Sequence, residues 1–141
     1  MKRTMCLLLS FVLCISLFTL GVFAEEKELL LSEIKFKSGA TVDSEIKWLE
    51  RGYYFGYENV DLTGINSVKI TAYNKLVTGT NGVTMAIVTD EPKTGNIIGY
   101  VTLTEVGEDV TVTSSIKPTE GVHNLYFYSL YGKNTVNETR I

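Results

Sequence analysis

Hydrophobic and polar residues alternate along much of the chain with a repeat of two. The clearest example is the segment 110–116, which reads Val-Thr-Val-Thr-Ser-Ser-Ile. Such alternation is typical of a β-strand with one buried face. After a short charged stretch at 25–28, no segment shows a comparable helical repeat. The pattern therefore predicts an all-β protein.

Other segments rich in Val, Ile, Thr and Tyr are bounded by clusters of Gly, Asn, Asp and Pro, which are typical of turns. These segments and 110–116 predict about eight short strands. The further segments are 29–36, 53–60, 67–73, 83–89, 97–103, 124–130 and 135–141. Short strands at this spacing indicate a β-sandwich or a β-barrel.

An aromatic cluster, "YYFGY" at 53–57, is divided by the same alternation. Successive side chains of a strand point to opposite faces, so Tyr53, Phe55 and Tyr57 share one face. Tyr54 points the other way, together with Gly56. We therefore expect three of the four rings to lie in the core.

The first residues have the pattern of a secretory signal peptide. Lys2 and Arg3 precede an apolar run at 5–23, and the residues Val-Phe-Ala at 22–24 have the pattern of a cleavage site. A single membrane-spanning anchor is the alternative, but the run is short and is interrupted by Ser10, Ser16, Thr19 and Gly21. We predict a signal peptide at 1–24 and one secreted domain at 25–141, without membrane attachment after cleavage.

Charge and cysteine content narrow the candidate partners. Cleavage removes Cys6 and Cys14, so no disulfide is expected in the secreted domain. It also removes two basic residues and no acidic one, which leaves 11 basic against 16 acidic residues and a formal charge of −5. Nucleic acids and anionic membranes are therefore not expected partners.

Residues for catalysis are scarce. His123 is the only histidine, and no glycine-rich phosphate loop is present. Triads, zinc sites and phosphate sites therefore lack necessary parts. The acidic residues do not form a recognisable glycosidase motif. We predict that the protein is not an enzyme and that His123, just before an apolar run, has a structural role.

Three segments resemble, in order and approximate spacing, the strands of carbohydrate-binding module family 6. They are "GYENVDLTGINSVKI" (56–70), "TDEPKTGNIIGYVTL" (89–103) and "GVHNLYFYSLYG" (121–132). The resemblance covers essentially the whole secreted domain. It implies a jelly-roll β-sandwich of about eight or nine antiparallel strands. It also implies non-catalytic binding of a polysaccharide or oligosaccharide and association with a glycoside hydrolase.

The resemblance also implies a sugar site at one edge of the sandwich. A sugar ring stacks its apolar face on an aromatic ring while polar groups bond its hydroxyls. Trp48 matches the family's first stacking residue, although a tryptophan in a sandwich is often a core residue. Asn137 and Asp43 match the polar partners, with Glu45 as an alternative to Asp43. Tyr54 or Tyr53 would be a neighbour of the sugar.

Two departures from the family pattern matter. The stretch 105–110 contains no aromatic residue where the family has a second stacking ring. The missing ring would lower the affinity for sugar by about tenfold or more. Glu33 matches a glutamate that helps bind a structural calcium ion, but Thr139 replaces an aspartate that often contributes to that site. The alternative interpretation of Glu33 and Asp43 is that each is a solvated carboxylate in a loop. The missing ring supports an alternative function, a structural or protein-interaction module that has lost sugar binding.

Overall fold

The computed structural model describes residues 27–74, 83–105, 107–131 and 134–140. The predicted signal peptide, residues 1–24, lies outside the described residues. Within the described ranges, no helix has both the length and the apolar character needed to cross a membrane.

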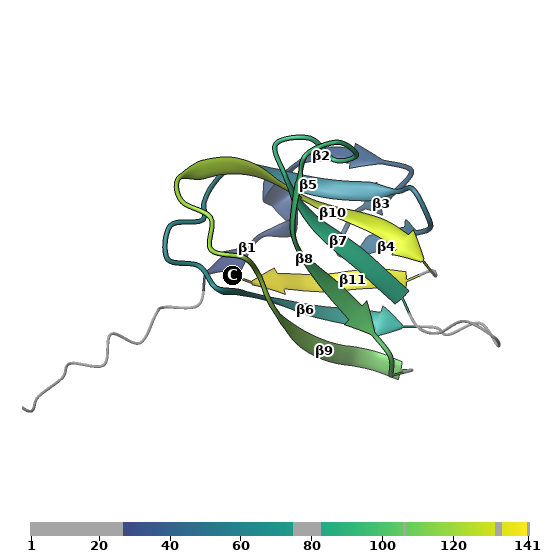
Figure 1. Cartoon of the computed structure of the whole chain (residues 1–141). Helices are drawn as coiled ribbons and strands as arrows, with labels where there is room; N and C mark the ends of the chain where they lie inside the picture. Colours follow the sequence, from purple (N-terminus) through teal and green to yellow (C-terminus); the bar gives the residue numbers. More distant parts are fainter. Residues whose placement is uncertain (1–26, 75–82, 106, 132–133, 141) are drawn as a thin grey trace, which may run out of the picture.

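The described strands form two sheets in which every pairing is antiparallel (Figure 1). The six-stranded sheet has the order β3 (Thr41–Val42), β4 (Ile46–Leu49), β11 (Asn134–Arg140), β6 (Ser67–Asn74) and β9 (Gly107–Ser115), with β1 (Glu28–Leu29) also paired to β11. The five-stranded sheet has the order β2 (Ile34–Ser38), β5 (Tyr54–Asp61), β10 (Val122–Tyr131), β7 (Val83–Thr89) and β8 (Asn96–Leu103).

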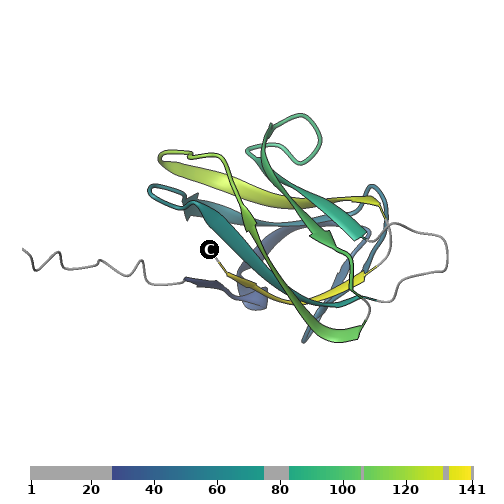
Figure 2. The same ribbon diagram turned by 60° about the horizontal axis from the view of Figure 1, so that its bottom comes forward.

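The two sheets lie one above the other as the layers of a β-sandwich (Figure 2). Nine of the described strands have four or more residues, and β1 and β3 have two each. The predicted all-β sandwich is therefore confirmed.

The predicted strand at 29–36 is wrong as a single element. A 3-10 turn at Leu31–Glu33 interrupts it, and the Leu30 amide donates to Glu33 Oε2 at 3.1 Å. The break has a topological reason, because β1 belongs to the six-stranded sheet whereas β2 begins the five-stranded sheet. One straight strand cannot pair in both layers.

The core lies between the layers and is centred on three aromatic rings. Phe55 stacks on Phe127 with ring centroids 4.8 Å apart, and Tyr57 meets both rings edge-on. Apolar side chains from both sheets surround them, including Ile46, Val68, Ile70, Met85, Ile87, Val101, Leu103 and Leu125. Large buried rings contribute strongly to stability, since each removes much apolar surface from water.

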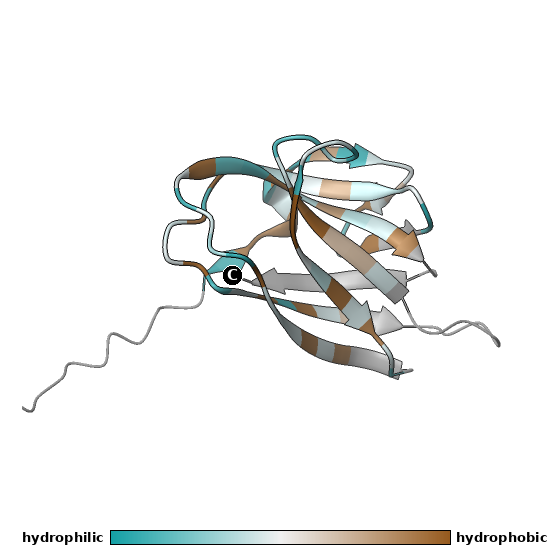
Figure 3. Cartoon of the chain, in the orientation of Figure 1, coloured by the Kyte–Doolittle hydropathy of each residue, from teal (hydrophilic) through white to brown (hydrophobic). Residues whose placement is uncertain are grey.

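Alternation along β5 is confirmed. Phe55 and Tyr57 are buried in the core, and Tyr53, just before the strand, packs against it. Tyr54 joins a separate cluster on the outer face of the same sheet. Figure 3 shows the resulting change between hydrophobic and hydrophilic positions along the strands.

One buried hydroxyl within the described residues lacks a hydrogen-bond partner. Ser129 on β10 is fully buried, and its Oγ neither donates nor accepts. Leaving such a group unpaired costs free energy, whereas alanine removes the unpaired oxygen. We expect Ser129→Ala to raise the free energy of unfolding by about 1 kcal/mol in urea titrations.

The matched control is Ser115→Ala on the exposed face of β9, with an expected change within about 0.5 kcal/mol. A clear loss of stability in Ser129→Ala would show instead that the hydroxyl has a partner in solution.

Candidate functional site

The outer face of the five-stranded sheet is unusually apolar and aromatic. A sheet face turned to solvent is normally polar. Here it carries a cluster of apolar and aromatic side chains, which are Phe36, Tyr54, Ala86, Val88, Tyr126, Tyr128 and Leu130. Ala86, Val88 and Tyr126 are buried within this cluster, and the other members are partly exposed, so the accessible rings at its surface are the candidates for a binding surface.

Strand register arranges this face into two rows that run across the strands. The first row, from β2 to β8, is Phe36, Gly56, Tyr126, Val88 and Ile97. The second row is Ser38, Tyr54, Tyr128, Ala86 and Tyr100. Tyr100 is the most accessible of these rings, with 52% of its surface exposed. Neighbouring strands lie about 4.8 Å apart, so Tyr54 and Tyr128 are close neighbours, and Tyr100 follows two strands further on.

Tyr126 is the centre of the first row, and its ring packs against Gly56. Its ring centroid is 5.2 Å from that of Phe36 and 6.0 Å from that of Tyr54, which it meets edge-on. A Cβ built on Gly56 would lie 2.6 Å from Tyr126 Cδ1 and 2.8 Å from the Leu125 carbonyl oxygen. Glycine therefore allows the ring to lie close to β5.

The environment of Tyr126 keeps its hydroxyl protonated. Burial is the main cause that raises the pKa of Tyr126, and the nearby charge of Glu91 adds to it. Tyr126 is only 5% exposed, so it supports the face rather than offering a large surface. The rings of Tyr54, Tyr128 and Tyr100 are more accessible than that of Tyr126.

A tight turn delivers Tyr54 to this face. Gly52 has a φ of 87°, in the left-handed region that favours glycine, and its amide donates to the Ser129 carbonyl at 2.8 Å. The Tyr53 amide donates to the Glu50 carbonyl at 2.9 Å, and the Ser129 amide donates to the Tyr53 carbonyl at 2.8 Å. These bonds carry the chain from β4 in one sheet to β5 in the other.

Two of the predicted sugar-binding residues lie on neighbouring strands. Trp48 is part of β4 and Asn137 is part of β11, and these strands pair through Leu49 with Asn134 and Ile46 with Val136. The side chains of Trp48 and Asn137 lie outside the described residues. The predicted stacking and hydroxyl-binding roles therefore stay predictions.

Asp43 lies in the same sheet, in the connection between β3 and β4. It is exposed, and its amide donates to the Glu45 carbonyl at 3.1 Å. Strands β4 and β11, which contain Trp48 and Asn137, and the connection that contains Asp43 are thus neighbours, as the predicted edge site requires. Tyr54, the fourth predicted residue, lies instead in the other sheet, on its outer face.

Sequence reasoning missed Tyr100, Tyr126 and Tyr128 as site candidates. The segment "NLYFYSL" at 124–130 already contained the signal, because alternation separates Tyr126 and Tyr128 from Phe127. What the sequence did not contain was the pairing that sets these tyrosines beside Tyr54.

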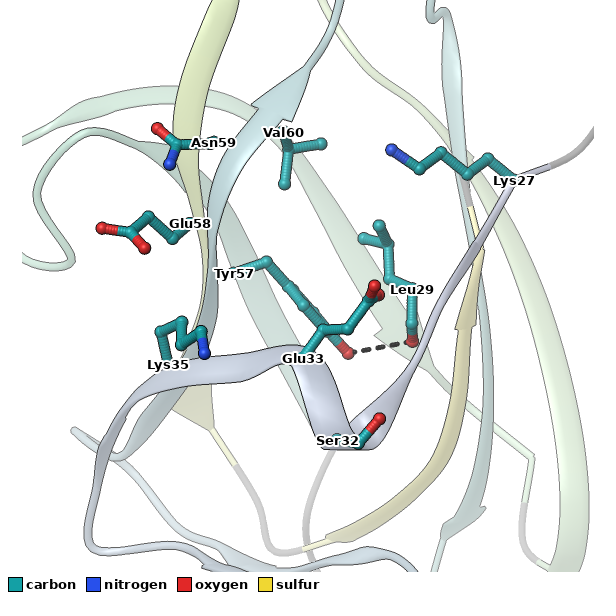
Figure 4. Close-up of a pocket in the computed structure, with 9 residues that line it drawn as sticks. All are labelled: Lys27, Leu29, Ser32, Glu33, Lys35, Tyr57, Glu58, Asn59 and Val60. Carbon is teal, nitrogen blue, oxygen red and sulfur yellow. Dashed lines mark hydrogen bonds between the residues drawn. The ribbon is translucent and has the colours of Figure 1, made fainter.

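Glu33 lies in a separate hollow of about 370 Å³ at the edge of the sandwich (Figure 4). β2 pairs with β5 only as far as Ile34 and Tyr57, and the hollow opens beyond this point. Tyr57 donates its hydroxyl to the Leu29 carbonyl at 3.3 Å on one side. Lys27 and Lys35 also line the hollow, on either side of Glu33.

The residues described around Glu33 offer few carboxylates to a calcium ion. Calcium takes six to eight oxygen ligands, supplied by carboxylates, by backbone and amide carbonyls and by water. One Glu33 oxygen already accepts the Leu30 amide, and the described residues contain no group of three His, Cys, Asp or Glu that would hold a metal. Thr139, whose backbone pairs with Leu29, has no carboxylate to add. The two lysines also oppose a divalent cation.

Comparison with known proteins gives a match of fold. No family model and no curated protein matches the chain. Among solved structures, a family 6 carbohydrate-binding module from Clostridium cellulolyticum in complex with xylose has a TM-score of 0.66 and 19% identity, over 80% of this chain and 94% of that one. A β-1,3-glucan-binding module of the same family from Bacillus halodurans has a TM-score of 0.63 and 21% identity, over 82% and 92%.

A third similar structure is an enzyme. The glycoside hydrolase family 43 arabinoxylan arabinofuranohydrolase from Bacillus subtilis, in complex with cellotetraose, has a TM-score of 0.58 and 16% identity, over 67% of this chain and 20% of that one. The chain is thus similar to a small part of that enzyme. At these low identities, the structural similarity establishes the fold alone, which is that of family 6 carbohydrate-binding modules. The resemblance that the sequence indicated is therefore confirmed.

The close approach of Tyr126 to Gly56 gives the first prediction from this site. We expect Gly56→Ala to destabilise the protein by about 1–3 kcal/mol, because the new methyl group would overlap the ring and a backbone oxygen. Urea titration measures the loss. Combining Gly56→Ala with Tyr126→Leu should recover part of it, since the ring is one of the two obstacles. Fully additive effects of the two substitutions would contradict the contact.

The donor set around Glu33 gives the second prediction. A bound ion would stabilise the folded state and raise its melting temperature. Because we expect no ion to bind at Glu33, the melting temperature should be the same in excess calcium and in a chelator. Glu33→Gln is the matched variant, since it keeps the acceptor for the Leu30 amide. An increase in melting temperature with calcium that is lost in Glu33→Gln would contradict this and assign the carboxylate to an ion.

Proposed function

We propose that this chain binds a polysaccharide or oligosaccharide without cleaving it, and that the outer face of the five-stranded sheet carries the sugar platform. The observation behind the proposal is the second row of that face, where Tyr54, Tyr128 and Tyr100 stand on three strands of one sheet. The sandwich fold is shared with modules whose described ligands are sugars.

The chemistry of tyrosine suits this ligand class. A pyranose offers an apolar C–H face and a rim of hydroxyls, and a tyrosine offers an apolar ring and a phenolic hydroxyl. Ala86 stands between Tyr128 and Tyr100 in the row, so only a small side chain separates the two rings. A row of separated rings favours an extended glycan chain over a single buried sugar.

The edge formed by β3, β4 and β11 is the second place where sugar would bind. It rests on the resemblance of Trp48, Asp43 and Asn137 to family residues, and the loop at 105–110 lacks the second ring. The outer face supplies rings that this edge lacks. We therefore assign the main contribution to the outer face.

Non-catalytic action is part of the proposal. His123, the only histidine, links Asp90 to the carbonyl oxygen of Glu120, and these two contacts support a structural role. Secretion is supported by the signal sequence at 1–24. Association with a glycoside hydrolase is supported by the similarity to one part of the arabinofuranohydrolase.

A protein-interaction module is the alternative that the same face supports, because tyrosine-rich patches are also typical of protein interfaces. The experiment below separates the two functions, since a protein-binding face would leave every glycan unbound.

Titration calorimetry with xylan, β-glucan and their oligosaccharides tests the proposal. We expect the affinity of the chain for at least one glycan to fall about tenfold in Tyr54→Ala and in Tyr128→Ala, because each removes one stacking ring. Ser38→Ala, in the same row, is the matched control and should keep the affinity of the parent protein. No reducing sugar should be released from any of the glycans.

Trp48→Ala compares the two places directly. Binding that is lost in Trp48→Ala but retained in both tyrosine variants would move the site to the edge of the sandwich. Absence of binding to every glycan would reject sugar binding itself and favour the interaction module.

A further inference from the structure

His123 connects two loops that are distant in sequence, at the opposite end of β10 from Tyr128. Its Nδ1 lies 3.0 Å from Asp90 Oδ1 and 3.2 Å from Oδ2, just after the end of β7. Its Nε2 lies 3.0 Å from the carbonyl oxygen of Glu120, in the loop before β10. The imidazole ring is therefore the link between the two loops.

Both partners of the ring are acceptors. A carboxylate and a carbonyl oxygen can only accept, so both ring nitrogens must donate, and both donate only when the imidazole is protonated. In the neutral ring one nitrogen loses its proton. The carboxylate favours a proton on Nδ1, so Nε2 becomes the acceptor and faces the Glu120 oxygen without a bond. Deprotonation therefore breaks the bond to Glu120.

Backbone hydrogen bonds on both sides of Glu120 limit the length of the segment that the loss of the His123 bond would release. The Lys117 amide donates to the Ile98 carbonyl at 2.7 Å, and the Gly121 amide donates to Thr63 Oγ1 at 3.0 Å. Between these two anchors, the bond from His123 is the connection of the loop to the end of β7. The segment 118–120 is thus the part that the imidazole holds.

This segment borders a hollow of about 620 Å³. Lys117, Pro118 and Thr119 line it from the loop, and Thr89, Ile97 and His123 line it from the strands. Ile97 also ends the first row of the outer face, so the hollow adjoins that face. Movement of 118–120 would change the wall of the hollow.

We propose that His123 is a proton-operated tether, which holds the segment 118–120 when protonated and releases it when neutral. The inference goes beyond sugar binding and does not depend on it. It also gives the predicted structural role of His123 a specific form.

The electrostatic surroundings support a charged ring. The bond to Asp90 is the main cause that raises the pKa of His123, and the Glu120 carbonyl adds to it, whereas burial opposes it. The charged groups on the elements next to the ring are Asp61, Asp90, Glu91, Lys117 and Glu120, and of these side chains Asp90 is the one bonded to the imidazole. Because the pKa of His123 is raised in the folded state, the tether contributes its full stabilisation at pH values below the usual histidine pKa of about 6.5. This stabilisation is lost as the pH rises through the pKa of His123 in the folded state.

Nuclear magnetic resonance of the chain from residue 25 tests the tether. We expect the ring of His123 to titrate above about pH 6.5 and the carbonyl carbon of Glu120 to titrate at the same pH. The Leu62 amide, which donates to the Gly121 carbonyl beyond the segment, is the internal control and should change far less. In Asp90→Asn, both transitions should move toward the ordinary histidine value.

Melting temperatures give a second readout. The parent protein should melt higher than Asp90→Asn by about 1–4 °C at about pH 5.5, and the difference should disappear by about pH 9. Either of two results would overturn the proposal: a His123 pKa at or below the ordinary value, or a Glu120 carbonyl that does not follow the ring.

Discussion

The stack of Phe55 on Phe127 is the contact on which the rest of the molecule depends. It joins β5 to β10 in the middle of the five-stranded sheet, with the ring centroids 4.8 Å apart, and fills the space between the two layers. Residues next to each ring along the strands must point outward, because side chains alternate. The inward stack therefore fixes Tyr54 beside Tyr128 on the outer face.

An irregularity in the same strand pair sets the position of the histidine. Between Tyr57 and Val60, β5 has one residue more than β10 has between Leu125 and His123. Asn59 takes up the extra residue with a φ of 55°, and its amide donates to Asn124 Oδ1 at 3.3 Å. This bulge ends the regular alternation of β10 just where His123 meets Asp90, as bulges often do next to functional residues.

The proposed sugar face and the tether thus lie at opposite ends of β10, on one scaffold. The tyrosines use the regular part of the strand, where every second side chain is outward. His123 lies past the bulge, where loops approach. A rigid strand pair in the centre of a sheet suits both roles, since its neighbours hold it on each side.

The sequence predicted much of the fold because the longer strands carry a local signal. The strand 83–89 was predicted with its observed bounds, and 67–73 and 97–103 differ by one residue. The short strands β3 and β4 were missed, because Asp43, Ser44 and Glu45 lie between them and hide any alternation. The turn at Leu31–Glu33 was missed for a different reason: it depends on which sheet each flank joins.

The sequence by itself determined which rings share a face of each strand, since alternation is a property of the local backbone. It separated Phe55 from Tyr54, and the same rule, applied to β10, separates Phe127 from Tyr128. Only the tertiary structure decided that β5, β10, β7 and β8 are neighbours, and hence that Tyr54, Tyr128 and Tyr100 form one row. The reason is that hydrogen bonding between strands distant in sequence is set by the packing of the whole sandwich, which no local pattern encodes.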